Sequence, residues 1–280
     1  MKENTITNKI KLIGIFFIIL MNLFKLSIIS IMFFTAPEFS IYDRVRPSET
    51  DDILGDIKSH LHNNYYDVTI KDYPTGSIVS QDSLNISTVH ESTHGINSFL
   101  RNKYSTNENK VNAFYCLNNQ YIVIKESNLA LKGVGKNIPK SIRFTSYDLC
   151  FNSKISESWN DRCLYLCDEF LSHGNATMYR KQKKIRERDS AIKFAFEYGM
   201  YSLVHLQMLK GTDYEDYDKL KWFHEWNFNR CFDTFDGESG LIDNMKIFIT
   251  SKDCEALRLF IAQEFGQEFY ERFYKIGNMN

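Results

Sequence analysis

The residues best suited to chemistry lie together in the segment His-Glu-Ser-Thr-His, at positions 90–94. His90 and His94 are four residues apart, so in a helix they stand one turn apart on one face. Both imidazoles can then reach one Zn²⁺ at about 2.0–2.1 Å. Glu91 is turned by about 100° from His90, which lets its carboxylate act as general base toward a water. The pattern therefore predicts a catalytic zinc site.

Such a site needs a third protein ligand and an open fourth position. The longer motif with a third histidine would require Gly at position 97 and His at position 100, but the sequence has Asn97 and Leu100. We therefore expect the third ligand from an acid later in the chain. Glu169 is favoured because it lies in an apolar stretch where a lone carboxylate is costly, and Asp168 and Glu126 remain alternatives.

Asp168 has a second interpretation beside Glu169. If Glu169 binds the metal, Asp168 is expected to orient one of the motif histidines from behind. Without a metal, the two acids are a pair near a helix N-terminus, where the helix dipole stabilises negative charge.

Hydrolysis of an amide also needs a hydrogen-bond donor for the oxyanion that forms. Tyr147, His173 and Tyr179 are near the expected ligand in the sequence, and we favour His173 and Tyr179 as catalytic residues. Any one of the 16 tyrosines more often serves to pack the core.

The motif at 90–94 resembles the active-site helix of zinc metallopeptidases of the gluzincin type, which take their third ligand from a Glu on a later helix. The segment Glu-Phe-Leu-Ser-His at 169–173 is similar to the second helix of lethal-factor-like peptidases. In that family the Glu at the place of Glu169 binds zinc, and an acid follows where this sequence has His173. The resemblance implies a zincin-like fold, a zinc cofactor and a peptide or protein substrate.

A weaker resemblance covers about residues 85–180. There the sequence is similar to uncharacterised bacterial proteins that carry the HExxH motif, through the segments 94–98, 112–115 and 168–169. This likeness supports the same metal site and implies no substrate.

The N-terminal segment at 12–36 is almost continuously apolar and follows Lys2, Lys9 and Lys11. These features are typical of a signal peptide, and the length also suits an uncleaved membrane anchor or, less readily, a buried helix. We therefore expect a secreted or extracytoplasmic protein, with membrane association through 12–36 if the segment is retained. All six cysteines follow this segment and could pair as disulfides or pack as buried thiols.

Periodicity predicts an α+β domain over 37–280, with a strand-rich part at 37–150 and a helical part at 151–280, and the resemblance implies that this domain is zincin-like. The strand-rich part includes an expected strand at 66–70, a motif helix at 83–102, a hairpin at 112–125 and a short strand at 141–145. The expected helices of the second part are at 160–178, 185–210, 214–232 and 252–275.

Charge limits the choice of function. The chain has 34 basic and 35 acidic residues and a net charge of −1, which argues against nucleic-acid binding through a basic surface. The sequence therefore favours a secreted or anchored zinc metallopeptidase. A non-enzymatic surface or secreted interaction protein with a structural or degenerate zinc site is the alternative.

Overall fold

A computed structural model describes residues 86–116, 120–152, 155–184, 191–235 and 239–279. The chain divides into two units, Met1–Asp43 and Arg44–Asn280, and the first lies outside the described residues. The apolar segment at 12–36 and the expected strand at 66–70 also lie outside them.

The predicted motif helix is confirmed as α3, Ile86–Tyr104. Its apolar side chains Val89, Ile96 and Leu100 recur at helical spacing and are buried, so one face of α3 packs against the rest of the protein. Because the two motif histidines lie inside this single helix, their spacing is fixed by helix geometry.

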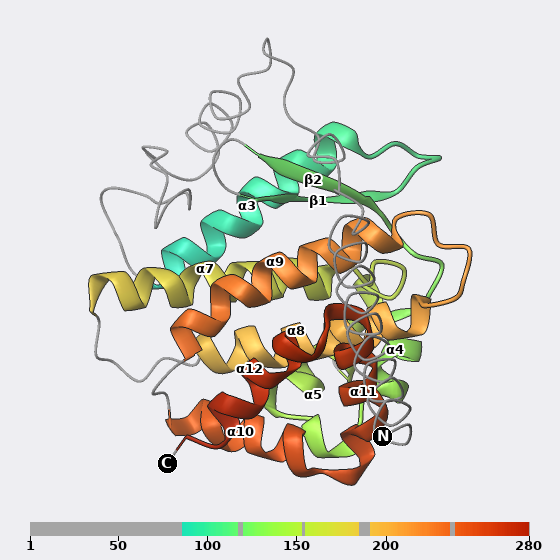
Figure 1. The fold of residues 1–280 in the computed structure, drawn as a ribbon. Helices are drawn as coiled ribbons and strands as arrows, with labels where there is room; N and C mark the ends of the chain where they lie inside the picture. The colour runs from blue at the N-terminus through green and yellow to red at the C-terminus, as the bar shows by residue number, and fades with distance from the viewer. Residues whose placement is uncertain (1–85, 117–119, 153–154, 185–190, 236–238, 280) are drawn as a thin grey trace, which may run out of the picture. The chain divides into compact units, whose positions relative to one another are not determined.

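The predicted hairpin is also confirmed. It consists of β1, Val111–Tyr115, and β2, Tyr121–Lys125, which pair antiparallel with Val111 opposite Lys125 and Tyr115 opposite Tyr121. Figure 1 shows the hairpin beside α3. Ile96 and Leu100 of α3 share a buried cluster with three hairpin residues, Ala113, Tyr115 and Tyr121.

The short strand expected at 141–145 is wrong. A 3₁₀ turn, Lys140–Ile142, occupies this place and is followed by helix α5, Thr145–Phe151. The backbone N–H and the hydroxyl of Ser146 both donate to the carboxylate of Glu197, at 2.9 and 2.5 Å. An acid 51 residues away therefore satisfies the first turn of α5, and local propensity could not reveal that.

The described residues of 151–280 are helical, as predicted, but the divisions between the helices differ. The expected helix at 252–275 is two helices, because Gly266 has φ 90° and ends the first of them. Helix α10 was not predicted as a separate element, and α4 lies where no helix or strand was predicted. The remaining elements are α4 (Leu131–Asn137), α6 (Ile155–Ser158), α7 (Tyr165–Lys183), α8 (Ala191–Leu209), α9 (Tyr217–Phe235), α10 (Ser239–Thr250), a 3₁₀ turn (Lys252–Cys254), α11 (Glu255–Phe265) and α12 (Gln267–Gly277).

The general α+β character is confirmed, with many helices and one two-stranded antiparallel sheet in the described residues. The described part of 37–150 holds more helix than strand, which departs from the strand-rich prediction. All six cysteines are buried and form no disulfide. Within the part of the chain that the structure describes, no helix has both the length and the apolar character needed to cross a membrane.

Candidate metal site

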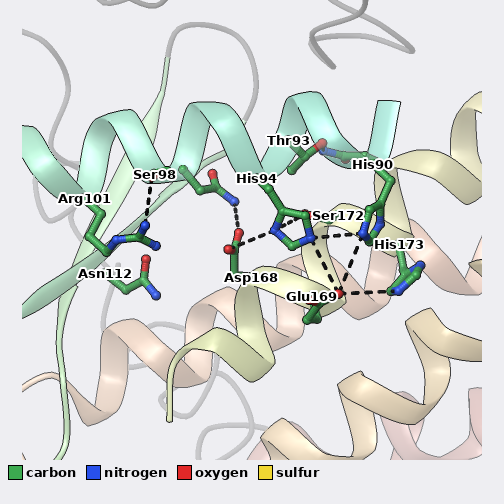
Figure 2. Close-up of polar contacts among 12 residues, drawn as sticks. His90, Thr93, His94, Ser98, Arg101, Asn112, Asp168, Glu169, Ser172 and His173 are labelled. Carbon is green, nitrogen blue, oxygen red and sulfur yellow. Dashed lines mark hydrogen bonds and ion pairs between the residues drawn. The ribbon is translucent and has the colours of Figure 1, made fainter. Parts of the chain in front are cut away.

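Two long helices, α3 and α7, bring the site residues together. Figure 2 shows His90 and His94 of α3 facing Glu169 of α7. The Nε2 atoms of the two histidines are 3.0 Å apart. Oε2 of Glu169 lies 3.8 Å from Nε2 of His90 and 3.6 Å from Nε2 of His94. Three potential ligand atoms, two from α3 and one from α7, therefore converge on one point.

The donor set suits a metal ion. A point about 2.0 Å from all three atoms exists inside the triangle they form, and this is the bond length of zinc to imidazole and carboxylate. Two imidazoles and one carboxylate are also a ligand set of catalytic zinc sites. In the described residues, His90, His94 and Glu169 form the one group of metal-binding side chains this close together.

Asp168 stands behind His94, as the sequence led us to expect. Its Oδ2 lies 3.0 Å from Nδ1 of His94, and its Oδ1 accepts a hydrogen bond of 2.6 Å from Nδ2 of Asn97. The hydroxyl of Ser172 is a further neighbour of Nδ1, at 3.3 Å. Burial opposes ionisation of Asp168, but His94 and Asn97 outweigh it and hold the pKa of this carboxyl below its ordinary value. Asp168 is therefore an ionised acceptor that orients the ring of His94.

The two motif histidines differ in charge when no metal is bound. Burial, together with the nearby charge of His94, lowers the pKa of His90 to about 4. Burial also disfavours the charged form of His94, but Asp168 and Glu169 outweigh it and raise its pKa to about 11. His94 can therefore donate from Nε2 to the neutral His90 across their 3.0 Å contact. A metal ion at this point must displace that proton, as metal binding to histidine generally does.

His173 lies at the same site, one turn after Glu169 on α7. Its Nε2 is 3.5 Å from Oε2 of Glu169, and its ring centroid is 4.2 Å from that of His90. Burial and the two motif histidines lower its pKa well below the ordinary value. Nδ1 is buried without a hydrogen-bond partner. The proton of the neutral ring is therefore best placed on Nε2, which faces the metal-binding atoms.

Glu91 is exposed on the face of α3 beside His90. Its carboxylate is therefore open to solvent. The role of general base stays a prediction.

Glu126, one alternative for the third ligand, lies elsewhere. It follows β2, and its Oε2 accepts a hydrogen bond of 3.2 Å from the backbone N–H of Leu164, immediately before α7. Burial raises its pKa to about 8. Glu126 therefore lies at the N-terminus of α7. Asp168 contacts His94 at Nδ1. Of the three acids, only Glu169 has an oxygen near the Nε2 atoms of both His90 and His94.

The tyrosines proposed as oxyanion donors are not at the site. Tyr179 is buried and lies ten residues beyond Glu169 on α7, which is about 15 Å along the helix. The hydroxyl of Tyr147 donates to the backbone oxygen of Gly135 at 3.1 Å. Tyr198 of α8 is near instead, with its ring stacked on His173 at a centroid distance of 5.6 Å.

Sequence reasoning missed Asn97, Ser172 and Tyr198. A signal existed for two of them, because Asn97 is three residues after His94 and Ser172 three residues after Glu169, on the same helix faces. Tyr198 carries no such signal, since its position depends on how α8 packs against α7. Comparison of the chain with models of known protein families, with curated proteins and with solved structures found no match.

Proposed function

We propose that the protein is a zinc-dependent hydrolase, most simply a metalloendopeptidase with a zincin-like active site. The observation that carries the proposal is the convergence of His90, His94 and Glu169 from two helices, with Asp168 behind one histidine. Asp168 is buried and Glu169 half-buried beside the two histidines, and a bound metal ion would replace the proton of His94 as the positive charge that balances these acids. The resemblance of the motif to gluzincins supports the same function.

Each residue has a defined task in this proposal. When bound, a zinc ion with an open position lowers the pKa of a water and polarises the carbonyl of the substrate. Glu91 takes the proton from the attacking water and passes it to the leaving amine. His173, with the proton on Nε2, donates a hydrogen bond to the oxyanion.

A peptide substrate could bind at the site itself or along the edge of the hairpin. An extended peptide could in general add to an open strand edge. On the outer edge of β1, however, the backbone N–H of Ala113 donates to Oδ1 of Asn112 at 3.0 Å, and that of Tyr115 donates to Oδ1 of Asn97 at 3.0 Å. A peptide or protein substrate is therefore proposed to bind from the side of Glu91 and not by pairing with β1. The near-neutral net charge still argues against a nucleic acid.

The setting of the enzyme is proposed from the apolar segment at 12–36. If this segment is a signal peptide or anchor, hydrolysis takes place outside the cytosol, on a secreted or membrane-attached enzyme.

A structural zinc site in a non-enzymatic secreted or surface protein is the second candidate, and the nearness of His173 favours it. If Nε2 of His173 were a fourth ligand, the site would be closed, as structural sites are. Replacement of this residue separates the two: His173→Gln keeps zinc if the histidine is a donor and loses zinc affinity strongly if it is a ligand.

The test of the hydrolase is Glu91→Gln in the zinc-loaded, full-length chain, assayed on an unfolded protein and on a peptide mixture. We expect turnover to fall by about 10²- to 10⁴-fold, with zinc content and Tm unchanged, because only the general base is removed. Glu225→Gln, an exposed acid of α9, is the matched control and should retain activity. A wild type that holds zinc but cleaves neither substrate would favour the structural site, and a fully active Glu91→Gln would contradict the role of Glu91 as general base.

A further inference from the structure

We propose that Asn97 is a positioning residue for the metal site: it connects the backbone of β1 to Asp168 and, through Asp168, fixes the orientation of His94. The inference rests on the proposed zinc site and goes beyond it, because Asn97 touches neither the metal-binding atoms nor a substrate. The side chain is fully buried between α3, α7 and the hairpin.

The orientation of the Asn97 amide is set by the backbone. The N–H of Tyr115 donates to Oδ1 of Asn97 at 3.0 Å. A backbone N–H can only donate, so the atom that faces it must be the amide oxygen. The amide NH₂ therefore points the opposite way, toward α7.

That NH₂ donates to Oδ1 of Asp168 at 2.6 Å. The other oxygen of Asp168, Oδ2, is thereby directed at Nδ1 of His94, 3.0 Å away. Both oxygens of this buried carboxylate are then engaged as acceptors.

His94 receives its orientation at the end of this chain of contacts. Because Nδ1 must donate to Asp168, the atom left to bind a metal is Nε2, and Nε2 is the atom that faces His90 and Glu169. The series Tyr115, Asn97, Asp168, His94 thus fixes which nitrogen of the ring is presented (Figure 2 shows the contact of Asp168 with His94). Residues in this outer shell commonly change metal affinity by about 10- to 100-fold when replaced.

A purely structural role, in which Asn97 only ties the hairpin to α3, makes a different prediction. Asn97→Asp separates the roles, because the new carboxylate still accepts from Tyr115 but cannot donate to Asp168 when ionised. The exchange variant, which combines Asn97→Asp with Asp168→Asn, restores the pairing. In it the amide introduced at position 168 donates its NH₂ to the carboxylate introduced at position 97, and its oxygen accepts from His94.

The matched control is Asn112→Asp. Asn112 is likewise fully buried, and its Oδ1 also accepts from a backbone N–H, that of Ala113, but its Nδ2 has no partner. This variant buries a carboxylate on β1 without disturbing Asp168, so it measures the general cost of the charge.

The experiment measures the Zn²⁺ dissociation constant and the Tm of the full-length chain near pH 8, with Co²⁺ absorption as a report on ligand geometry. We expect Asn97→Asp and Asp168→Asn each to weaken Zn²⁺ binding by about 10- to 100-fold and to alter the Co²⁺ spectrum. The exchange variant should bind Zn²⁺ at least about tenfold more tightly than Asp168→Asn does, and Asn112→Asp should bind Zn²⁺ as tightly as the wild type does.

The inference is overturned if Asn97→Asp binds Zn²⁺ as tightly as the wild type, or if Asn112→Asp weakens binding equally. If Asn97→Asp does not fold, the comparison of the exchange variant with Asp168→Asn decides, and equal affinities overturn the inference. A wild type that binds no zinc would instead contradict the proposed function itself.

Discussion

Asp168 and His94 meet at 3.0 Å between Oδ2 and Nδ1, although 74 positions separate them in the sequence. The contact turns Nε2 of His94 toward His90 and Glu169, so one buried acid orients a ring while its neighbour in the chain supplies a ligand atom. Adjacent acids on α7 thus have two different tasks, because successive residues of a helix point about 100° apart.

Acid should destabilise the protein through two buried histidines that are not part of the metal site. His205 and His224 are fully buried, and burial lowers their pKa values to about 3 and about 4. The unfolded chain takes up these protons below about pH 6.5, whereas the folded chain does not, so stability is lost as the pH falls from 6.5 toward 4.

Urea unfolding at pH 7 and pH 5 measures this effect. Each histidine is expected to contribute about 2 kcal/mol to the loss of unfolding free energy between these values. His224→Gln should therefore lower the slope of stability against pH, even if the variant is less stable throughout. An unchanged slope would mean that His224 becomes protonated in the folded protein.

Glu126 should have the opposite dependence on pH. Its pKa is raised to about 8 by burial, so its contribution to stability is fully present below about pH 4.5 and is lost as the pH rises through 8. Glu126→Gln keeps an oxygen for the N–H of Leu164 and removes the charge. In thermal unfolding, we expect Glu126→Gln to have the Tm of the wild type near pH 5 and a higher Tm than the wild type near pH 9. Its zinc content should equal that of the wild type. Loss of zinc from this variant would return Glu126 to the candidates for third ligand.

Close helix packing around α7 depends on Gly199 of α8. A Cβ there would lie 2.7 Å from Cζ of Phe228 and 3.0 Å from Cε2 of Phe170, and both rings are fully buried. Gly199→Ala should therefore lower stability by about 1–3 kcal/mol, as overpacking of a core does.

Gly133→Ala is the matched control, because it is also in a helix but has nothing within 4 Å of the added carbon. It should be neutral or gain about 0.5–1 kcal/mol from helix propensity. Denaturant unfolding of both variants checks the pair, and equal effects would contradict the close approach of α7, α8 and α9.

Much of the fold near the site could be predicted from local patterns. The motif helix followed from the spacing of Val89, Ile96 and Leu100, and the hairpin followed from two β-branched and aromatic runs around Asn118-Asn119. The start of α5 could not be predicted, because Glu197 of α8 satisfies its first turn. The division at Gly266 was missed because the apolar stripe continues through both helices on either side of it.

The residues of the metal site could also be predicted only in part from the sequence. The choice of Glu169 rested on an acid within an apolar helix, and the structure gives it the position expected of a ligand. Tyr179 was an avoidable error, because ten residues of helix carry a side chain about 15 Å away. Asn97 was considered only as a departure from the longer histidine motif, and its contact with Tyr115 depends on where the hairpin packs.

The most direct test of the account is the zinc content of the purified full-length chain beside His90→Ala and Glu169→Ala. His224→Gln and Glu126→Gln serve as controls, since each replaces the same type of residue away from the site. We expect about one zinc per chain in the wild type and in both controls, and its loss in both site variants. Folded wild type without zinc, or zinc retained by Glu169→Ala, would contradict a site built from His90, His94 and Glu169.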